Sequence, residues 1–200
     1  MPTSFEKIKK IFNKAYESGT FAVGNLDIDN FYNINEEYGR ACGDKVIEFI
    51  SEILKESLPE GIVVERSGDE FFVMSTEHTA ETLLMELEEV RKQIEGSELE
   101  CEGYILKFTV SGAVADIPRS ASSVDSLVHV LEDGLYTAKK QGRNRIIFAP
   151  VEGKQKMSLK SSYYPKSQLE KLSRLAKRLK KTESALLREA LTDLLRKYSQ

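Results

Sequence analysis

The stretch Arg66-Ser-Gly-Asp-Glu-Phe-Phe-Val73 decides the fold of this chain. Apolar β-type runs at 62–64 and 71–74 flank a short segment of small residues. This pattern predicts a β-hairpin with Ser67-Gly68 at its bend. The adjacent carboxylates Asp69-Glu70 then stand where the second strand leaves the turn. Because a buried carboxylate without a partner costs several kcal/mol, this pair needs a cation.

A second acidic pair, Asp27 and Asp29, follows the apolar run 21–26. If the two strands are neighbours in one sheet, carboxylates from both meet at one sheet end. Mg²⁺ prefers oxygen ligands and usually keeps phosphate oxygens and water in its shell, so the sequence predicts a magnesium site there. On these residues alone an alternative stays open, in which Asp27 and Asp29 cap a helix and Asp69-Glu70 belong to a solvated turn.

Three blocks of the sequence resemble the GGDEF domain of diguanylate cyclases. Ser67-Gly-Asp-Glu-Phe71 stands for the family signature, with Ser in place of its first Gly. The segment 27–44 is similar to the family's D-x-D-x-F-K-x-x-N-D-x-x-G-H-x-x-G-D run, and 135–146 to its closing A-L-Y-x-A-K-x-x-G-R-N-R-V. The blocks follow the family's order and spacing over residues 5–148. The resemblance implies a palm-like α/β fold with a mixed central sheet and flanking helices, which the alternation of strand and helix patterns also predicts.

The same resemblance implies a diguanylate cyclase, which joins two GTP molecules into cyclic di-GMP with Mg²⁺ or Mn²⁺. It implies catalytic roles for Glu70 and Asp69. It implies that the metal ligands are Asp27, the backbone carbonyl of Ile28, Asp69 and Glu70. Substrate-binding positions carried over from the family are Phe31, Asn35, Asp44, Ser67, Gly68, Lys139 and Arg143. For the last two, a solvated basic helix end that complements the helix dipole is the alternative.

The sequence departs from the family pattern at several positions. Tyr32 replaces the usual Lys, Arg40 the usual His, and Glu65 the Arg two residues before the signature, for which Arg66 could substitute. The opening D-x-L-T-G-L-x-N-R motif is missing, and the inhibitory R-x-x-D would fall on 58–61, where it is absent. These departures leave a second interpretation open, a transcriptional regulator whose GGDEF domain only binds GTP or a cyclic dinucleotide as a ligand.

Charge is distributed unevenly along the chain. Residues 153–200 carry 13 of the 29 Lys+Arg and 4 of the 32 Asp+Glu, so their formal charge is +9 and that of the remainder is −12. An acidic body with a basic tail indicates that the tail meets a polyanion. Residues 149–156 lack periodicity and contain Pro and Gly, which predicts a linker. We therefore expect a GGDEF domain over 1–148, the linker over 149–156 and a second domain over 157–200.

The tail resembles a ribbon-helix-helix domain. A β-like stretch, 157–164, ends at Pro165, one helix starts at Ser167, and Thr182 caps another. About 45 residues are too few to bury a core alone, so we expect a homodimer. The resemblance implies duplex DNA as a partner, read in the major groove by the paired strands. With the strand register open, the implied DNA-binding residues are Lys160, Ser161, Ser162, Thr182 and Ser184. The alternative is a basic dimerisation hairpin without a DNA target.

Two further predictions concern the compartment. Cys42 and Cys101 lack C-x-x-C spacing, so we expect two reduced, half-buried thiols. No apolar run approaches the roughly 18 residues of a membrane span. The N-terminus begins an amphipathic pattern, which predicts a helix over 5–15, and lacks the apolar stretch of a signal peptide. We therefore expect a cytoplasmic protein with no membrane partner.

Overall fold

The computed structural model describes residues 21–151, 162–179 and 181–198. The chain divides into two compact units, Met1–Gln155 and Lys156–Gln200, and each is described by itself. The helix predicted over 5–15 lies outside the described residues. So do the first five residues of the predicted β-like stretch.

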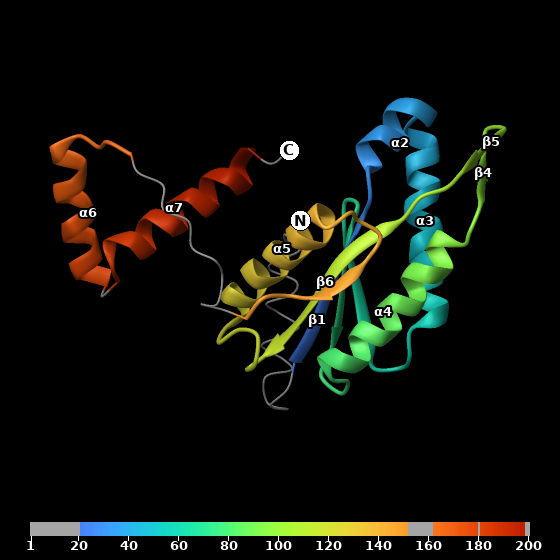
Figure 1. Ribbon diagram of the computed structural model, residues 1–200, viewed down its shortest axis with the longest axis horizontal. Helices are drawn as coiled ribbons and strands as arrows, with labels where there is room; N and C mark the ends of the chain where they lie inside the picture. The colour runs from blue at the N-terminus through green and yellow to red at the C-terminus, as the bar shows by residue number, and fades with distance from the viewer. Residues whose placement is uncertain (1–20, 152–161, 180, 199–200) are drawn as a thin grey trace. The chain divides into compact units, whose positions relative to one another are not determined.

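Unit 1 is built on a five-stranded sheet with strand order β2-β3-β1-β6-β7 (Figure 1). Neighbouring strands are antiparallel except for β6 and β7, which run parallel, so the predicted mixed sheet is confirmed. All eight residues of the central strand, β1, are buried. The strands are β1 Phe21–Ile28, β2 Ile62–Ser67, β3 Glu70–Ser75, β6 Val110–Ile117 and β7 Ile146–Phe148.

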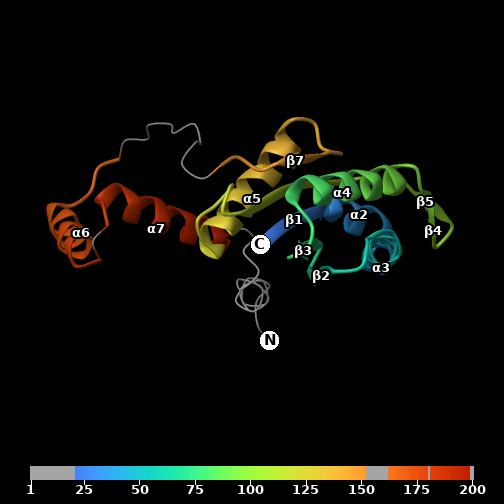
Figure 2. The same ribbon diagram turned by 90° about the horizontal axis from the view of Figure 1, so that it is seen from below.

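Helices cover both faces of the sheet (Figures 1 and 2). Side chains alternate between the faces along each strand. On β3, Phe71 and Val73 join the core formed with α3 and α4, whereas Phe72 and Met74 join the core formed with α5. The helices of unit 1 are α2 Phe31–Tyr38, α3 Arg40–Ser57, α4 Ala80–Glu95 and α5 Val124–Lys140.

The β2–β3 hairpin differs by one residue from the sequence prediction. Ser67 pairs with Glu70, so the two-residue loop consists of Gly68 and Asp69, not of Ser67 and Gly68. Gly68 has φ of +65°, a conformation that only glycine adopts without strain. The turn therefore places Asp69 in the loop itself and Glu70 at the first position of the outgoing strand.

The sequence pattern of residues 104–115 predicts one long strand, but the structure has two strands there, β5 Tyr104–Leu106 and β6. β5 pairs with β4 Leu99–Cys101 in a separate two-stranded sheet, and only β6 joins the main sheet. Between β5 and β6, Phe108 turns inward and packs edge-to-face against Phe49, with 5.9 Å between ring centroids. This inward aromatic interrupts the strand at a point where the apolar pattern continues.

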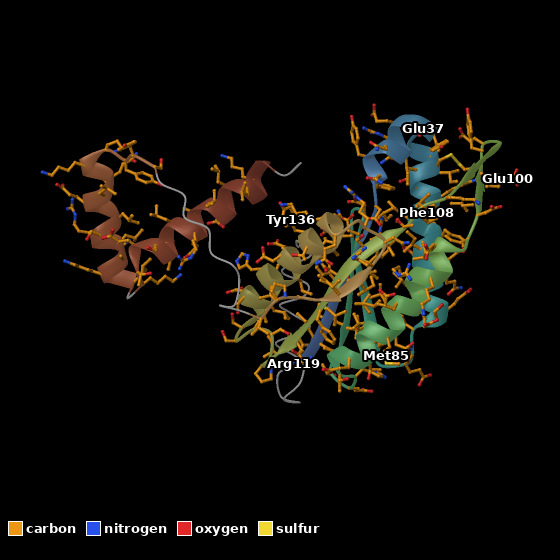
Figure 3. All side chains as sticks on the ribbon, in the orientation of Figure 1. Glu37, Met85, Glu100, Phe108, Arg119 and Tyr136 are labelled. Atoms are coloured by element: carbon orange, nitrogen blue, oxygen red, sulfur yellow. A yellow bond between two sulfur atoms is a disulfide. The ribbon has the colours of Figure 1, made fainter. Side chains whose placement is uncertain are left out.

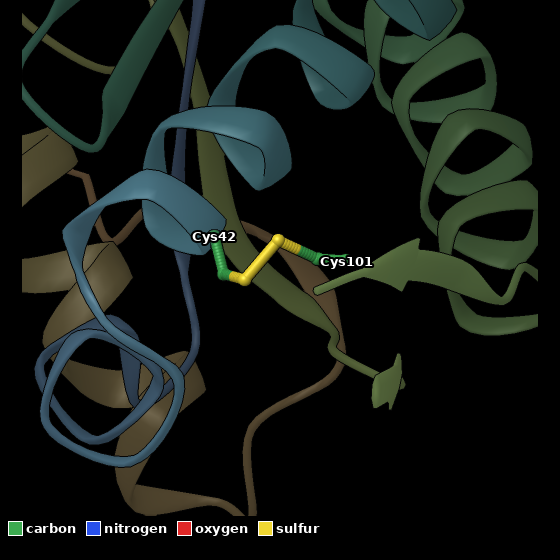
Figure 4. The surroundings of a disulfide bond; sticks show 2 residues. All are labelled: Cys42 and Cys101. Carbon is green, nitrogen blue, oxygen red and sulfur yellow. A yellow bond between two sulfur atoms is a disulfide. The ribbon is translucent and has the colours of Figure 1, made fainter. Parts of the chain in front are cut away.

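The prediction of two reduced thiols is wrong, because Cys42 and Cys101 form a disulfide (Figure 4). Cys42 lies near the start of α3 and Cys101 ends β4, and both are fully buried. Folding brings their Cα atoms to 5.7 Å, within the range that a disulfide spans. A sequence separation of 59 residues gives no local sign of this contact.

Unit 2 contains α6 Lys166–Leu179 and α7 Glu183–Tyr198. The Thr182 hydroxyl accepts a hydrogen bond from the Ala185 N–H at 3.2 Å, as the predicted cap requires. Within the described residues of the chain, the helices are all too short or too polar to cross a bilayer.

Candidate active site

Three carboxylates gather where β1 ends and β3 begins. Asp27 pairs directly with Glu70 across the two strands, and Asp69 precedes Glu70 in the hairpin loop. The strand alternation places Asp27 and Glu70 on the face covered by α5. Asp27 is buried, whereas Asp69 and Glu70 are half-buried. The sheet therefore brings Asp27 to the Asp69-Glu70 pair, which lies about forty residues further along the sequence.

Burial and neighbouring charge raise the pKa values of two of these carboxylates, Glu70 and Asp27. Burial, followed by the charges of Asp27 and Asp69, raises the pKa of Glu70 from 4.5 to about 7. Burial also raises the pKa of Asp27, although Lys139 opposes this shift. The Lys139 Nζ lies 2.6 Å from the Asp27 carboxylate and reaches it from the last turn of α5. A lysine thus supplies positive charge at the place where the sequence predicts a metal ion.

The donor set suits a hard cation. Carboxylate oxygens and the Ile28 carbonyl are the oxygen ligands that Mg²⁺ and Mn²⁺ prefer. After burial, the charges of Asp27 and Asp69 are the next causes of the raised pKa of Glu70, so a further positive charge at this site would be favourable. No three His, Cys, Asp or Glu side chains in the described part of the chain already enclose a point where an ion could sit. By their chemistry these oxygen donors would suit a divalent ion, whereas in this structure the cation in contact with Asp27 is Lys139.

Three of the predicted substrate-binding residues, Phe31, Asn35 and Asp44, lie at the junction of α2 and α3. Gly43 is buried, and a Cβ at this position would collide with Oδ1 of Asn35 and approach Phe31 Cζ to 3.2 Å. Asn35 can therefore lie across the α3 backbone only because residue 43 has no side chain. Asp44 follows on the exposed side of the same helical turn. The structure brings Phe31, Asn35 and the Gly43-Asp44 pair together.

The segment after α5 carries Arg143, another predicted substrate-binding residue. Gly142 has φ of +115° and Arg143 φ of +64°, so the chain turns sharply after the helix. The Arg143 N–H donates to the Ala138 carbonyl at 3.2 Å, and its side chain is exposed. Lys139 and Arg143 therefore flank the turn at the end of α5, with Lys139 directed to the carboxylates.

The structure shows where the residues that depart from the family pattern lie. Glu65 pairs with Phe72 and lies on the α5 face of the sheet, as Glu70 does. Arg66 pairs with Phe71 and lies on the opposite face, so it does not take the position of Glu65. Tyr32 is 72% exposed and Arg40 is also exposed, so neither belongs to the core.

Sequence reasoning gave Asp29 two roles, carboxylate of the cluster or helix cap, and the structure shows neither. α2 starts after Asn30, which makes no side-chain cap bond. Asp29 instead is buried and bonded within the fold, partly to Asn144. It also lines a cleft of about 380 Å³ together with Glu37 of α2 and Phe108, both of which are labelled in Figure 3. The Asn144 contact depends on residues 115 positions apart, which no local pattern reveals.

Of the predicted DNA-binding residues, Lys160 and Ser161 lie outside the described residues. Ser162 is exposed in a segment without regular structure. Thr182 caps α7 and Ser184 lies in its first turn, both exposed.

The chain is similar to proteins of one family. The family model described as "Diguanylate cyclase, GGDEF domain" matches residues 4–145. Diguanylate cyclase A of Treponema denticola is 31% identical over 142 residues, which are 70% of this chain and 38% of that protein. Diguanylate cyclase DosC of Escherichia coli K12 is 28% identical over 151 residues, 73% of this chain and 32% of that protein. The chain thus spans only about a third of the length of these relatives.

Solved structures show the same fold. The GGDEF domain of DgcB from Caulobacter crescentus, in complex with c-di-GMP, has a TM-score of 0.65 at 26% identity, covering 72% of this chain and 86% of that one. The GGDEF domain of YfiN from Pseudomonas aeruginosa has a TM-score of 0.69 at 23% identity, covering 76% and 98%. The family model covers most of the chain, and the solved GGDEF domains share its fold. The pairing of Asp27 with Glu70 and the hairpin that carries Asp69 fit this family. The chain therefore belongs to the GGDEF domain family.

Proposed function

We propose that this protein is a diguanylate cyclase, which condenses two GTP molecules into cyclic di-GMP and releases two pyrophosphates. The observation that carries this proposal is the pairing of Asp27 with Glu70, with Asp69 in the adjoining turn. Three carboxylates concentrate negative charge at one sheet end, next to Lys139 and close in sequence to Arg143. Such a site suits a nucleotide triphosphate that arrives with divalent ions.

Each half-reaction needs a ribose 3′-hydroxyl to attack the α-phosphate of the other GTP. Divalent ions, when bound, lower the pKa of the attacking hydroxyl and neutralise charge that develops on the phosphate. Glu70, with a pKa of about 7, is suited to accept the hydroxyl proton near neutral pH. The N–H groups of the Ser67-Gly68 segment are free of side-chain bulk and can donate to phosphate oxygens. Lys139 exchanges its bond to Asp27 for phosphate when substrate enters.

Guanine selection falls to Asn35 and Asp44. An amide and a carboxylate together match the acceptor and the paired N1–H and N2–H₂ donors of guanine. Adenine lacks this pair of donors. The close packing of Asn35 on Gly43 fixes one of the two readers before the base arrives.

One domain holds one GTP, so the reaction requires two copies face to face, and we propose that unit 2 supplies the dimer. In one chain, Ala176 and Leu186 are buried, but several leucines of α6 and α7 are more than a third exposed. A second copy that covers them would bury the core that this short unit otherwise lacks. The exposed leucines are Leu169, Leu179, Leu187, Leu191, Leu194 and Leu195.

We further propose that unit 2 binds duplex DNA as a ribbon-helix-helix dimer, with Lys160, Ser161 and Ser162 at the groove and Thr182 and Ser184 at a phosphate. The excess of basic residues in 153–200 supports this assignment. The test is fluorescence anisotropy of labelled duplex DNA with the full-length protein over a salt series. Affinity should fall steeply with salt and Lys160→Ala should weaken it. Absence of binding at low salt would leave a plain dimerisation module.

The position of Glu65 favours one other candidate function. A glutamate on the face of Glu70 repels a triphosphate, and the loss of one charge-assisted hydrogen bond costs about 1.5–3 kcal/mol. In this alternative the domain binds GTP or a cyclic dinucleotide only as a ligand that regulates the tail.

Incubation of the full-length protein with GTP and Mg²⁺ or Mn²⁺ decides between them. A cyclase yields cyclic di-GMP and pyrophosphate, identified by chromatography and mass spectrometry, and Asp69→Ala abolishes both. ATP serves as the control nucleotide. GTP binding without product across both metals and a range of pH would favour the ligand-binding alternative.

A further inference from the structure

The carboxylate of Asp29 accepts hydrogen bonds from three other residues of the domain. The donors are the Thr109 hydroxyl at 2.7 Å, the Ser111 hydroxyl at 2.8 Å and the Asn144 backbone N–H at 3.0 Å. Asp29 is 4% exposed, and its own N–H donates to the Thr109 carbonyl. Asp27, two residues earlier, bonds instead to a flexible lysine. The two aspartates of one segment therefore differ, since Asp27 has an exchangeable partner and Asp29 has fixed ones.

Asn144 connects Asp29 to α4. Its side-chain Oδ1 accepts from Arg91 Nη1 at 2.7 Å, and its Nδ2 donates to Glu95 Oε1 at 2.7 Å. Arg91 is itself buried and also bonds Glu88 and Glu95. Every polar group of Asn144 except its carbonyl is thus taken by the end of β1 or by α4.

Asn144 and the preceding Arg143 both have a strained backbone conformation. Asn144 has φ of +49° and Arg143 φ of +64°. Asn tolerates this left-handed conformation, but Arg rarely adopts it. Two successive left-handed residues other than glycine persist only where their surroundings hold them. Besides the bond from the Arg143 N–H to the Ala138 carbonyl, the side-chain and backbone contacts of Asn144 tie this turn to β1 and α4, and the turn sets the direction of Arg143.

We propose that Asp29, Asn144 and Arg91 are positioning residues, which hold Arg143 in the left-handed conformation that presents its guanidinium to the triphosphate of GTP. The proposal rests on the proposed function in one respect, namely that Arg143 binds phosphate. Asp27 and Asp29 then contact the two ends of the segment 139–144. Asp27 forms an ion pair with Lys139 at its start, and Asp29 accepts a hydrogen bond from the Asn144 N–H at its end.

A double-mutant cycle tests whether Asn144 acts through Arg143. GTP and GMP binding to full-length protein is measured calorimetrically with Ca²⁺ as the ion, for wild type, Asn144→Ala, Arg143→Ala and the double variant. Loss of one charge-assisted hydrogen bond predicts about tenfold weaker GTP binding for Asn144→Ala. Binding of GMP, which lacks the β- and γ-phosphates, should not change. The double variant should bind GTP no more weakly than Arg143→Ala alone. Arg119→Ala, which removes an exposed arginine paired with Glu81 and Asp116, is the control.

Tryptic cleavage after Arg143 tests the turn without any nucleotide. A locked turn resists the protease, so Asn144→Ala should be cleaved there several-fold faster than wild type, and Arg119→Ala should not change the rate at this bond. If Asn144→Ala does not fold by circular dichroism, Asn144→Gly removes the same side-chain bonds while allowing positive φ.

Each contrary result has a separate meaning. Unchanged cleavage, additive losses in the cycle, or equal losses for GTP and GMP would overturn the positioning role. A different outcome is that Asn144→Ala is cleaved faster while Arg143→Ala binds GTP as tightly as wild type does. This outcome would instead overturn the phosphate-binding assignment under the proposed function, and with it the role of the turn in substrate binding.

Discussion

Replacement of Glu70 by Gln should stabilise the metal-free protein at alkaline pH. Glu70 has a pKa of about 7 in the folded chain against 4.5 in a model peptide. The folded state therefore binds more protons than the unfolded state between these values, and stability falls as the pH rises through this window. At 1.36 kcal/mol per pKa unit, the full loss is about 3 kcal/mol above pH 7. Gln keeps the size of the side chain without the charge.

Urea denaturation in EDTA, followed by circular dichroism at pH 4.5 and pH 8, measures this difference. Glu70→Gln should match wild type at pH 4.5 and exceed its free energy of unfolding by up to about 3 kcal/mol at pH 8. Asp27 adds a slope of the same sign to both proteins, so the difference between the two curves reports Glu70 together with its coupling to Asp27. Glu100→Gln, at an exposed position of β4, is the matched control.

Divalent ions complete the test. Mn²⁺ should stabilise wild type at pH 8 more than the Gln variant, because the variant has lost one charged ligand. If Glu70→Gln is no more stable than wild type at pH 8, the crowding of Asp27, Asp69 and Glu70 does not exist in solution and the reasoning is refuted.

Gly43→Ala should weaken GTP binding, measured with Ca²⁺ as the ion, because the added methyl group displaces Asn35. Gly96→Ala is the control and should leave GTP binding unchanged. A Cβ at Gly96 would meet only backbone oxygens, at 3.4 Å or beyond. Lys139→Met should raise the affinity for Mn²⁺ in the absence of nucleotide by removing the competing cation, and an unchanged affinity by calorimetry would contradict the exchange on Asp27. Alanine at both Cys42 and Cys101 should lower the free energy of unfolding by about 4 kcal/mol through the lost closure of a 59-residue span. A dithiol reductant should destabilise wild type similarly and leave that variant unaffected.

Local patterns in the sequence determined most of the fold. The apolar runs on either side of the Gly68 turn predict the β2–β3 hairpin. Strand alternation places Asp27 and Glu70 on one face once the strands are taken as neighbours. These features depend on residues close in sequence, whose preferences the backbone geometry expresses directly.

The tertiary structure decided which distant residues meet. The Cys42–Cys101 bond, the Lys139–Asp27 pair and the Asp29–Asn144 contact join residues 59 to 115 positions apart. None of them follows from propensity, because each depends on how strands and helices pack after they form. The sequence alone therefore identified the acidic side chains, but not their partners. Packing of α5 and of the turn after it decided that Asp27 forms an ion pair with Lys139, which can be exchanged, and that buried Asp29 is hydrogen-bonded to the Asn144 backbone.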